Sequence, residues 1–356
     1  MSDKTGIEWT DATWNPVTGC AKVSQGCKHC YAEREWPRMT RLVPAYAGRD
    51  FTDVRTHEDR LDQPLRWKKP RKVFVNSMSD LFHSDVPDEF IDKVFITMAL
   101  CPQHTFQVLT KRADRMQDYV TRLNGGRLRN RLIMVDAPNS TLAWPLQNVW
   151  LGVSVEDQDA ADERIPLLLD TPAAVRWISA EPLLGPVDLT DLCDGVAWPD
   201  VPRNYWNEGF DSDDSPPSLR LDALAGEKLQ RFGNYSEYCA RLDWVVVGGE
   251  SGPKARPMSI QWARSLRDQC AEAGVPFLFK QWGEWAPAAV RQSETPGQFA
   301  YGDYEHEPGH FVNTDRYPRA FTSFGARAIV ERVGKKTAGR LLDGVKHDGY
   351  PEGGAA

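Results

Sequence analysis

The sequence predicts an α/β fold, a partial TIM-like βα barrel of about seven parallel strands with insertions. Short apolar runs rich in β-branched residues recur along the chain, each ends in a polar cluster, and a helical stretch follows most of them. Near-continuous apolar runs are typical of strands buried on both faces, which indicates a parallel sheet with helical crossovers. No Gly-rich dinucleotide fingerprint follows the first strand, which favours a barrel over an open doubly wound sheet.

The elements follow from these runs in chain order. The first strand is expected within residues 12–17, and the later apolar runs predict strands at 72–76, 105–109, 149–153, 175–178, 244–247 and 276–279. A helix is expected to begin at Tyr31 and to be cut short by Pro37. Another is expected from about Pro87 to Cys101, because proline and acids suit a first turn, and a final helix over 326–342.

One barrel-like domain is expected over residues 1–350, with two interruptions. Residues 188–242 are acidic and rich in Asp, Pro and Gly, which predicts an insertion between the fifth and sixth strands. Residues 284–322 lack a helical period and predict loops or a small hairpin over the rim. Residues 351–356 are expected to form a disordered tail.

Composition and charge limit the class of protein. The chain has 356 residues, of which 41% are hydrophobic and 26% charged, as in ordinary soluble globular proteins. No apolar run reaches membrane-spanning length and the N-terminus lacks a signal-peptide pattern, so a cytoplasmic location without a membrane partner is expected. Seven cysteines, an odd number, argue against a disulfide framework in such a compartment. The net charge of -7 argues against broad non-specific nucleic-acid binding but allows a local basic face.

Three cysteines near the N-terminus, Cys20, Cys27 and Cys30, have the spacing C-x6-C-x2-C and lie on a predicted loop. A loop can fold three sulfurs around one centre, whereas a regular helix or strand at this spacing could not. Three thiolates without a fourth nearby ligand suggest a centre with one open coordination position. A [4Fe–4S] cluster, a zinc ion with His29 as fourth ligand, and no metal are the alternatives. Because His29 stands between two of the cysteines and no second C-x2-C pair exists, the cluster is favoured.

Polar residues follow most of the predicted strands. In a barrel the carboxyl ends of the strands share one rim, so these residues and the cysteines are expected to converge there. The rim residues, in chain order, are Asn76, Ser77, Ser79, Asp80, Lys111, Arg112, Ser154, Glu156, Glu181, Gly248, Gly249, Glu250, Lys280 and Gln281. The plain alternatives are turn formation and helix capping or, for Lys111 and Arg112, a solvated surface.

The strand, the three-cysteine loop and the βα barrel together resemble the radical S-adenosylmethionine (SAM) superfamily. Its usual spacing is C-x3-C-x2-C with an aromatic residue before the last cysteine; here the first gap is six residues and His29 holds the aromatic position. The nearer resemblance is to the bacteriophage three-cysteine-motif family of radical SAM-like enzymes. It is carried, over nearly the whole chain except 188–242, by IEWTDATWNPVTGC (7–20), GCKHCYA (26–32), NSMSDLF (76–82), GGESG (248–252) and KQWG (280–283).

The resemblance implies that Cys20, Cys27 and Cys30 hold a [4Fe–4S] cluster whose open iron binds SAM. An electron donor of the flavodoxin or ferredoxin type would reduce the cluster, and cleavage of SAM would give a 5'-deoxyadenosyl radical that abstracts hydrogen from the substrate.

By the same resemblance, each rim residue is given a role. Asn76, Ser77, Ser79 and Asp80 would hold the amino group of SAM, where an acceptor is needed. The remaining cofactor contacts would be Ser154 and Glu156 at the ribose or carboxylate, and His29, Gly248, Gly249 and Glu250 near the adenine. Glu181, Lys280 and Gln281 are the catalytic candidates in contact with substrate, together with Lys111 and Arg112.

Two basic stretches are candidates for nucleic-acid contact. One contains Arg66, Trp67 and Lys68, and the other begins at Lys111, Arg112 and Arg115. Such residues can bind a phosphate backbone, and an enzyme that acts on a base needs that base turned out of the duplex. An ordinary helix surface is the alternative.

The phage resemblance implies DNA or a modified nucleoside as substrate, in the cytoplasm of a host cell. Such phages carry enzymes that elaborate thymidine, including an isomerase that rearranges an amino-acyl (glycinyl-type) thymidine through a radical. The alternatives are a DNA repair lyase of the spore photoproduct lyase kind and a zinc-stabilised nucleic-acid-binding protein.

Overall fold

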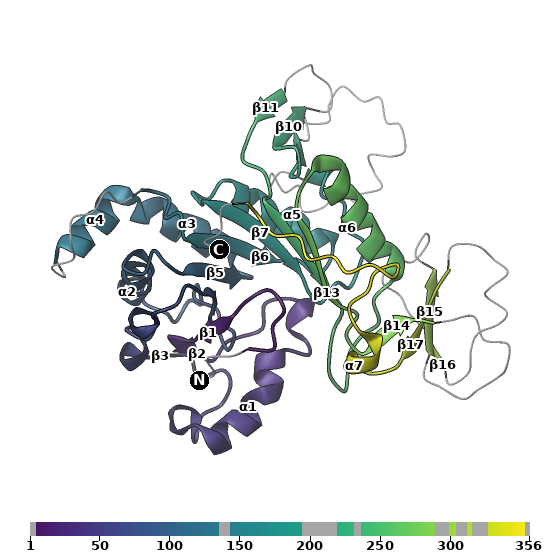
Figure 1. Cartoon of the computed structure of the whole chain (residues 1–356), viewed down its shortest axis with the longest axis horizontal. Helices are drawn as coiled ribbons and strands as arrows, with labels where there is room; N and C mark the ends of the chain where they lie inside the picture. The colour runs from purple at the N-terminus through teal and green to yellow at the C-terminus, as the bar shows by residue number, and fades with distance from the viewer. Residues whose placement is uncertain are drawn as a thin grey trace, which may run out of the picture.

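A seven-stranded parallel sheet, curled into a half-barrel, organises the chain (Figure 1). The computed structural model describes residues 5–134, 143–193, 219–230, 236–288, 299–303, 312–314 and 327–352. Sheet order follows chain order, β1-β4-β5-β6-β7-β12-β13, and each adjacent pair is parallel. The strands are β1 Ala12–Trp14, β4 Lys72–Val75, β5 Thr105–Thr110, β6 Val149–Ser154, β7 Val175–Ala180, β12 Trp244–Gly248 and β13 Phe277–Gln281. The predicted partial barrel is confirmed.

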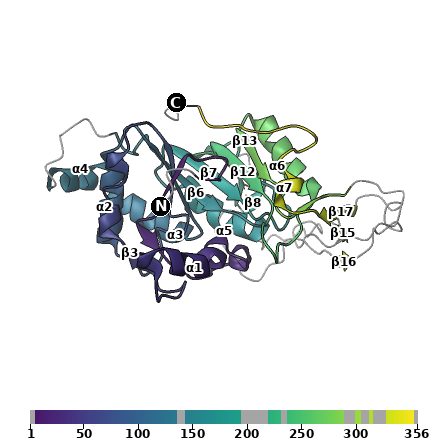
Figure 2. The same ribbon diagram turned by 60° about the horizontal axis from the view of Figure 1, so that its bottom comes forward.

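Helices cover the convex face of this sheet (Figures 1 and 2). They are α2 Asp88–Ala99, α3 Ala113–Leu123, α5 Gln158–Leu169 and α6 Ile260–Ala273, with α4 Gly125–Met134 beyond α3. Alternate strand residues such as Val75, Val108 and Val153 point toward these helices and belong to the main hydrophobic core. The helix predicted from Pro87 is confirmed, because Pro87 is the N-cap of α2.

Aromatic side chains fill the amino-terminal half of the concave face. Trp150, Trp177 and Trp244 pack with Trp9 in a separate cluster, and the rings of Trp177 and Trp244 are 5.3 Å apart. A Cβ at Gly152 would lie 2.5 Å from the indole of Trp177, so only glycine at this position leaves room for that ring over the neighbouring strand. A ligand would therefore reach the concave face from the carboxyl end of the strands.

Smaller elements complete the fold. Near the N-terminus lie the β2–β3 ribbon, α1 and four 3-10 helices: β2 Val17–Thr18, β3 Arg55–Thr56, α1 Tyr31–Leu42, η1 Gln25–Cys27, η2 Pro44–Tyr46, η3 Glu58–Arg60 and η4 Pro64–Arg66. The described part of the 188–242 insertion forms a four-stranded sheet of β8 Leu192–Cys193, β9 Leu219–Asp222, β10 Glu227–Gln230 and β11 Ser236–Tyr238. Within the described ranges, no helix has the length and apolar character needed to cross a membrane.

Two sequence-based predictions of local structure are wrong. Pro37 lies inside α1, because a proline removes one helical hydrogen bond without obliging the helix to end.

The segment after residue 284, where loops or a small hairpin were expected, contributes to a four-stranded antiparallel sheet. Its strands are β14 Trp285–Pro287, β15 Phe299–Asp303, β16 Val312–Thr314 and β17 Arg327–Arg332.

The helix expected over 326–342 is the second error. Its first half is β17, whose pairing with β14 and β15 overrides the helical pattern. Only the short α7, Lys335–Ala338, is helical, and glycines at 334 and 339 bound it. Within the expected tail, residues 353–356 lie outside the described residues.

Candidate functional site

The loop that carries the three cysteines lies across the carboxyl end of the half-barrel. It leaves β2, which is held beside the turn after β4, since Gly19 pairs with Ser79 and the Cys20 amide donates to the Phe51 carbonyl at 2.9 Å. The loop then forms η1 and leads into α1, for which Cys30 is the N-cap. Figures 1 and 2 both show α1 at this end of the sheet.

Asp80, after β4, provides the first attachment of this loop. Its Oδ2 accepts from Arg112 Nη1 at 2.9 Å, and Arg112 Nη2 donates to the Ala21 carbonyl at 3.1 Å. The same guanidinium lies 3.8 Å from the Cys20 sulfur. Asp80 also accepts from Phe82 N, Thr110 Oγ1 and Lys111 N. Protein donors therefore surround both of its carboxylate oxygens.

Glu156, after β6, provides the second attachment. Its Oε1 accepts from the Gly26 amide at 3.2 Å and its Oε2 from Arg164 Nη1 at 2.9 Å. The Glu156 and Arg164 side chains are only 2% and 3% exposed. Burial opposes ionisation of Glu156, but Lys111 and Arg164 outweigh it and hold its pKa below the ordinary value. A buried carboxylate thus binds the loop directly.

Glu250, after β12, provides the third attachment. Its carboxylate accepts from the backbone amide of Arg256 at 2.7 Å and from the guanidinium at 2.9 and 2.7 Å. Arg256 Nη2 also donates to the Gln25 carbonyl at 3.1 Å. Three strand ends therefore hold the cysteine loop. Asp80 acts through Arg112 at Ala21, Glu156 binds Gly26 directly, and Glu250 acts through Arg256 at Gln25.

The three cysteines are free thiols, each partly exposed. Burial, followed by the charge of Asp80, raises the pKa of the Cys20 thiol to about 11, although Arg112 opposes the rise. Within the described ranges, no group of three or more His, Cys, Asp or Glu is arranged to hold one metal ion. Thiolates are ligands of both zinc and [4Fe–4S] clusters, so the loop offers three ligands of a kind that either centre uses.

His29 lies among charged groups beside this loop. Burial lowers the pKa of its imidazole, as do Arg256, Lys28 and Lys254, while Glu250 opposes them. Lys28 and Lys254 are exposed and have no carboxylate partner within the described part of the chain. Neither lysine was expected at the site from the sequence, since neither belongs to a basic run.

The turn from Asn76 to Asp80 is fastened to the chain before the cysteine loop. Ser77 Oγ donates to Asn15 Oδ1 at 3.2 Å, Ser79 Oγ donates to the Val17 carbonyl at 2.8 Å, and Asn76 Oδ1 accepts from Val17 N at 3.3 Å. These contacts agree with the turn-and-cap alternative for Ser77 and Ser79. The Nδ2 of Asn76, by contrast, is buried without a partner among the described residues and remains able to donate to a ligand.

On the concave wall, the structure brings Glu181, Lys280 and Gln281 together. Lys280 Nζ donates to both Glu181 oxygens at 2.9 and 2.8 Å, and Gln281 Nε2 donates to Oε1 at 2.9 Å. Neighbouring strand residues normally point to opposite faces, but the register between β12 and β13 shifts at Val247/Gly248. Such a bulge re-aims side chains, and here both Lys280 and Gln281 reach the same carboxylate.

The other predicted cofactor residues lie near these groups. Ser154 is buried at the end of β6, and its carbonyl accepts from Arg164 at 2.8 Å. Gly248 lies beside the Glu181 carboxyl group, which a Cβ there would approach to 3.2 Å. Gly249 lies so close to β13 that a Cβ would come within 2.0 Å of the Trp282 carbonyl oxygen. The glycines therefore pack the strand ends closely.

The predicted nucleic-acid residues lie at both ends of the sheet, since Lys111 and Arg112 directly follow β5 and Arg112 contacts the cysteine loop. Arg66, Trp67 and Lys68 precede β4 and so lie at the amino end of the sheet. Trp67 is 8% exposed and packs edge-on against His104, so most of its ring is buried within the protein. Arg115 donates to the backbone of residues 83 and 86 and to Asp88, which leaves its guanidinium engaged within the protein.

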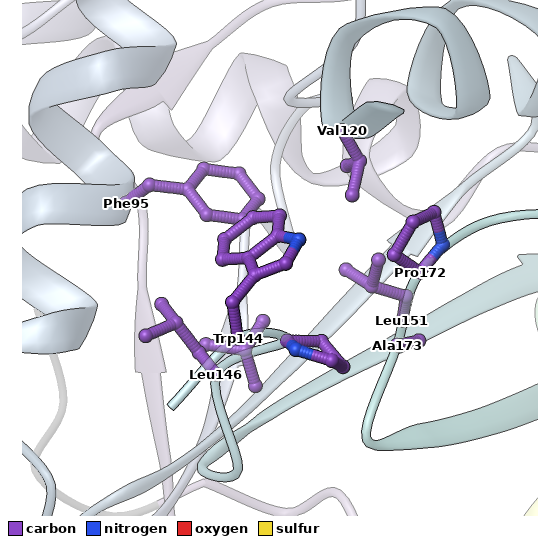
Figure 3. A pocket seen from close by; sticks show the side chains of 9 residues that line it. Phe95, Val120, Trp144, Leu146, Leu151, Pro172 and Ala173 are labelled. Atoms are coloured by element: carbon purple, nitrogen blue, oxygen red, sulfur yellow. The ribbon is translucent and has the colours of Figure 1, made fainter. Parts of the chain in front are cut away.

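A small apolar pocket lies far from the cysteine loop, between α2, α3 and the amino ends of β6 and β7 (Figure 3). Phe95, Val120 and Trp144 contribute to its lining. Its volume of about 10 Å³ is at the lower limit for a single water molecule. It is therefore a packing defect of the outer core and no candidate for the site.

Two arginines that complete the site were not expected from the sequence. Arg164 and Arg256 bind carboxylates that were expected at the rim, eight and six residues before them in the chain. A charged residue on the buried face of a predicted helix was the available signal for Arg164. Arg256 lies in an irregular loop, for which no periodic signal exists.

Comparison with known proteins identifies one family. The model of the family described as "Protein of unknown function (DUF5131)" matches residues 4–351. No curated protein matches the chain. No solved structure matches it either.

Proposed function

The chain belongs to the DUF5131 family of proteins of unknown function, and we propose that it is a radical SAM iron–sulfur enzyme that modifies a nucleic-acid base. One observation carries the proposal: three thiols on a single loop, held by Asp80, Glu156 and Glu250 over the open end of a half-barrel. Side chains at the carboxyl ends of barrel strands form the active sites of this fold.

In this proposal Cys20, Cys27 and Cys30 hold a [4Fe–4S] cluster with one iron free for SAM. When bound, the cluster would supply the electron that cleaves SAM into methionine and a 5'-deoxyadenosyl radical. Arg112 shapes the loop at Cys20, and Arg256 shapes it at Gln25. The resemblance implied that Asn76 accepts from the amino group of SAM, but its Oδ1 already accepts from Val17 N. Its Nδ2, which has no partner among the described residues, is instead assigned as a donor to the carboxylate of SAM. His29 and Gly249 border the place assigned to the adenine.

The concave wall is assigned to the substrate. Glu181, Lys280 and Gln281 project into it above the tryptophan layer, which excludes water from below. We assign an amino-acyl thymidine in phage DNA, or its nucleoside, as the substrate and an isomerisation as the reaction. The support is the sequence resemblance together with the neutral, hydrogen-bonding character of this wall.

The partners follow from this chemistry. Cleavage of SAM needs an external one-electron donor of the flavodoxin or ferredoxin type, and the proposed setting is the cytoplasm of a host cell. The exposed Lys28 and Lys254 beside the cysteine loop are the best placed cations for a DNA backbone.

The test is anaerobic incubation of the reduced protein with SAM and modified phage DNA. We expect 5'-deoxyadenosine and a nucleoside of unchanged mass but altered chromatographic retention. A Cys27→Ser variant, which lacks one thiol, is expected to give neither product. A colourless protein with stoichiometric zinc and no SAM cleavage would replace the proposal with that of a zinc-stabilised nucleic-acid-binding protein.

A further inference from the structure

Gln281 holds a buried hydrogen-bond acceptor that no described residue uses. The side chain is 4% exposed, and its Oε1 has no partner in the part of the chain that the structure describes. The orientation of the amide follows from chemistry, because the Glu181 carboxylate only accepts and must face the Nε2 of Gln281. Oε1 consequently points away from Glu181. A buried acceptor left unpaired is costly, so such an atom indicates a missing donor.

Lys280 supplies a donor in the same group of side chains. Its ammonium carries three protons, and two are directed at the two oxygens of Glu181. The third N–H of Lys280 is left for a ligand. Adjacent residues present this donor and this acceptor on one face only because of the bulge opposite Gly248.

The charge of the group limits what it can bind. Glu181 and Lys280 neutralise each other, and Gln281 is uncharged, so the group as a whole is neutral. A phosphate or a free carboxylate would find no net positive charge here. A neutral ligand that offers one carbonyl oxygen beside one N–H satisfies both free positions.

We propose that Glu181, Lys280 and Gln281 form a recognition site for the imide edge of a thymine- or uracil-type base, an inference that rests on the proposed function for its setting. The imide N–H donates to Gln281 Oε1, and the neighbouring carbonyl accepts from Lys280. Glu181 positions both side chains and does not itself contact the base. Cytosine offers an acceptor at the same ring nitrogen, which would face Oε1 and be rejected.

The surroundings suit a base. A Cβ at Gly248 would come within 3.2 Å of the Glu181 carboxyl group, so a larger residue there would press on this group. Below it, Trp177 and Trp244 provide an apolar floor at the level of the strand interiors. A base held here would lie under the cysteine loop, at the end of the half-barrel where Glu250 and Glu156 anchor that loop.

Equilibrium dialysis of the full-length protein against four nucleosides tests the site without relying on turnover. The probes are thymidine, N3-methylthymidine, 2'-deoxycytidine and 2'-deoxyadenosine. We expect thymidine to bind at least about tenfold more tightly than N3-methylthymidine and 2'-deoxycytidine, because each of those leaves Oε1 without a donor. Gln281→Met, close in size but without the amide, is expected to bind thymidine and N3-methylthymidine equally. Gln147→Met, an exposed glutamine at the amino end, is the matched control.

Equal affinity of the wild-type protein for thymidine and N3-methylthymidine would overturn the inference, as would absence of thymidine binding or a preference for 2'-deoxyadenosine. This comparison needs no variant, so it stands even when Gln281→Met fails to fold. Iron content and SAM cleavage are measured in parallel. Cleavage of SAM without a preference for thymidine over N3-methylthymidine would contradict only this inference. That preference in a protein without iron would contradict only the proposed function.

Discussion

Glu156 is the most buried of the three carboxylates that hold the cysteine loop, and its partner Arg164 is equally enclosed. Removal of one member of a buried ion pair leaves the other charge uncompensated, which costs far more than the pair itself contributes. The stability of this end of the molecule therefore depends on the two residues together.

We expect Glu156→Gln to lower the free energy of unfolding by about 3 kcal/mol, because the Arg164 guanidinium would stay buried beside a neutral amide. Denaturant unfolding at pH 7 measures the change. Glu163→Gln is the matched control, since Glu163 contacts the same arginine at 3.7 Å but has a side chain that is 68% exposed. Its effect should stay below about 1 kcal/mol. Equal effects of the two variants would show that Glu156 does not anchor the loop.

His57 makes the ribbon beneath the cysteine loop sensitive to pH. Its Nε2 lies 2.8 Å from Thr18 Oγ1, and burial, with Arg60 and Arg49, lowers its pKa to about 4. In the unfolded chain His57 has its ordinary pKa of 6.5 and binds a proton below that pH. In the folded protein it binds a proton only below about pH 4. The contribution of the neutral His57 to stability is thus complete above pH 6.5 and is lost as the pH falls toward 4.

The pH test compares wild type with His57→Gln by denaturant unfolding at pH 7 and pH 5. We expect the wild type to lose about 1 kcal/mol more than the variant over this interval, after allowance for solvent screening of a half-buried group. An identical loss in both proteins would place the pH sensitivity elsewhere.

At the residue scale, the sequence could identify which residues come after a strand but not what those residues bind. Asp80, Glu156 and Glu250 were each expected at the rim from their positions. Their arginine partners come from a helix and two loops, and no periodic pattern in the sequence relates each arginine to its carboxylate. The side chains of Ser77, Ser79 and Asp80 form hydrogen bonds within the protein, whereas the resemblance had assigned these residues to a cofactor.

At the element scale, the ends of β12 and β13 approach each other more closely than side chains allow. A Cβ on Gly249 would lie 2.0 Å from the Trp282 carbonyl oxygen, and one on Gly283 would lie 2.0 Å from the Glu250 carbonyl oxygen. These two glycines bring Glu250 and the Lys280–Gln281 pair to one rim.

We expect Gly249→Ala to destabilise the protein by at least about 2 kcal/mol, because the atom in the way belongs to backbone and cannot rotate aside. Gly6→Ala is the control, since nothing lies within 4 Å of the position that a Cβ would take there. Thermal and denaturant unfolding report the difference. A neutral Gly249→Ala would show that the two strand ends are not held in this close contact.

Strands were the best predicted elements, because a strand buried on both faces leaves an uninterrupted apolar run. All seven strands of the half-barrel lie within a few residues of their expected positions. The final helix failed because β17 gains its conformation from partners far away in the sequence, which no local pattern records. The bulge at Gly248 could not be predicted from the sequence either, although it determines where Gln281 points.

At the scale of the whole molecule, the charges are arranged differently from the basic runs in the sequence. Arg115 and Arg122 both bind Asp88, and Arg131 binds Asp92, so the basic face of α3 and α4 is largely neutralised. The exposed Lys28 and Lys254 lie instead beside the cysteine loop. Linear spacing cannot reveal which cations are paired, because the partners come from other elements.

DNA binding should follow this three-dimensional arrangement. We expect the double variant Lys28→Gln/Lys254→Gln to reduce the slope of log Kd against log salt by about two, one for each lost phosphate contact. Lys68→Gln/Lys69→Gln, two exposed lysines at the amino end, should leave the slope unchanged. Fluorescence anisotropy over a salt series measures both. A larger effect of the second pair would show that DNA binds at the opposite end of the half-barrel.

The central claim is that Cys20, Cys27 and Cys30 hold an iron–sulfur cluster at the mouth of the half-barrel. Iron and sulfide are determined on protein purified without oxygen, for wild type, for each of Cys20→Ser, Cys27→Ser and Cys30→Ser, and for Cys101→Ser, a buried thiol of the outer core. The account predicts about four iron and four sulfide per chain in wild type and Cys101→Ser, and a large loss in the other three variants. Iron-free wild-type protein, or equal iron in all five proteins, would contradict it.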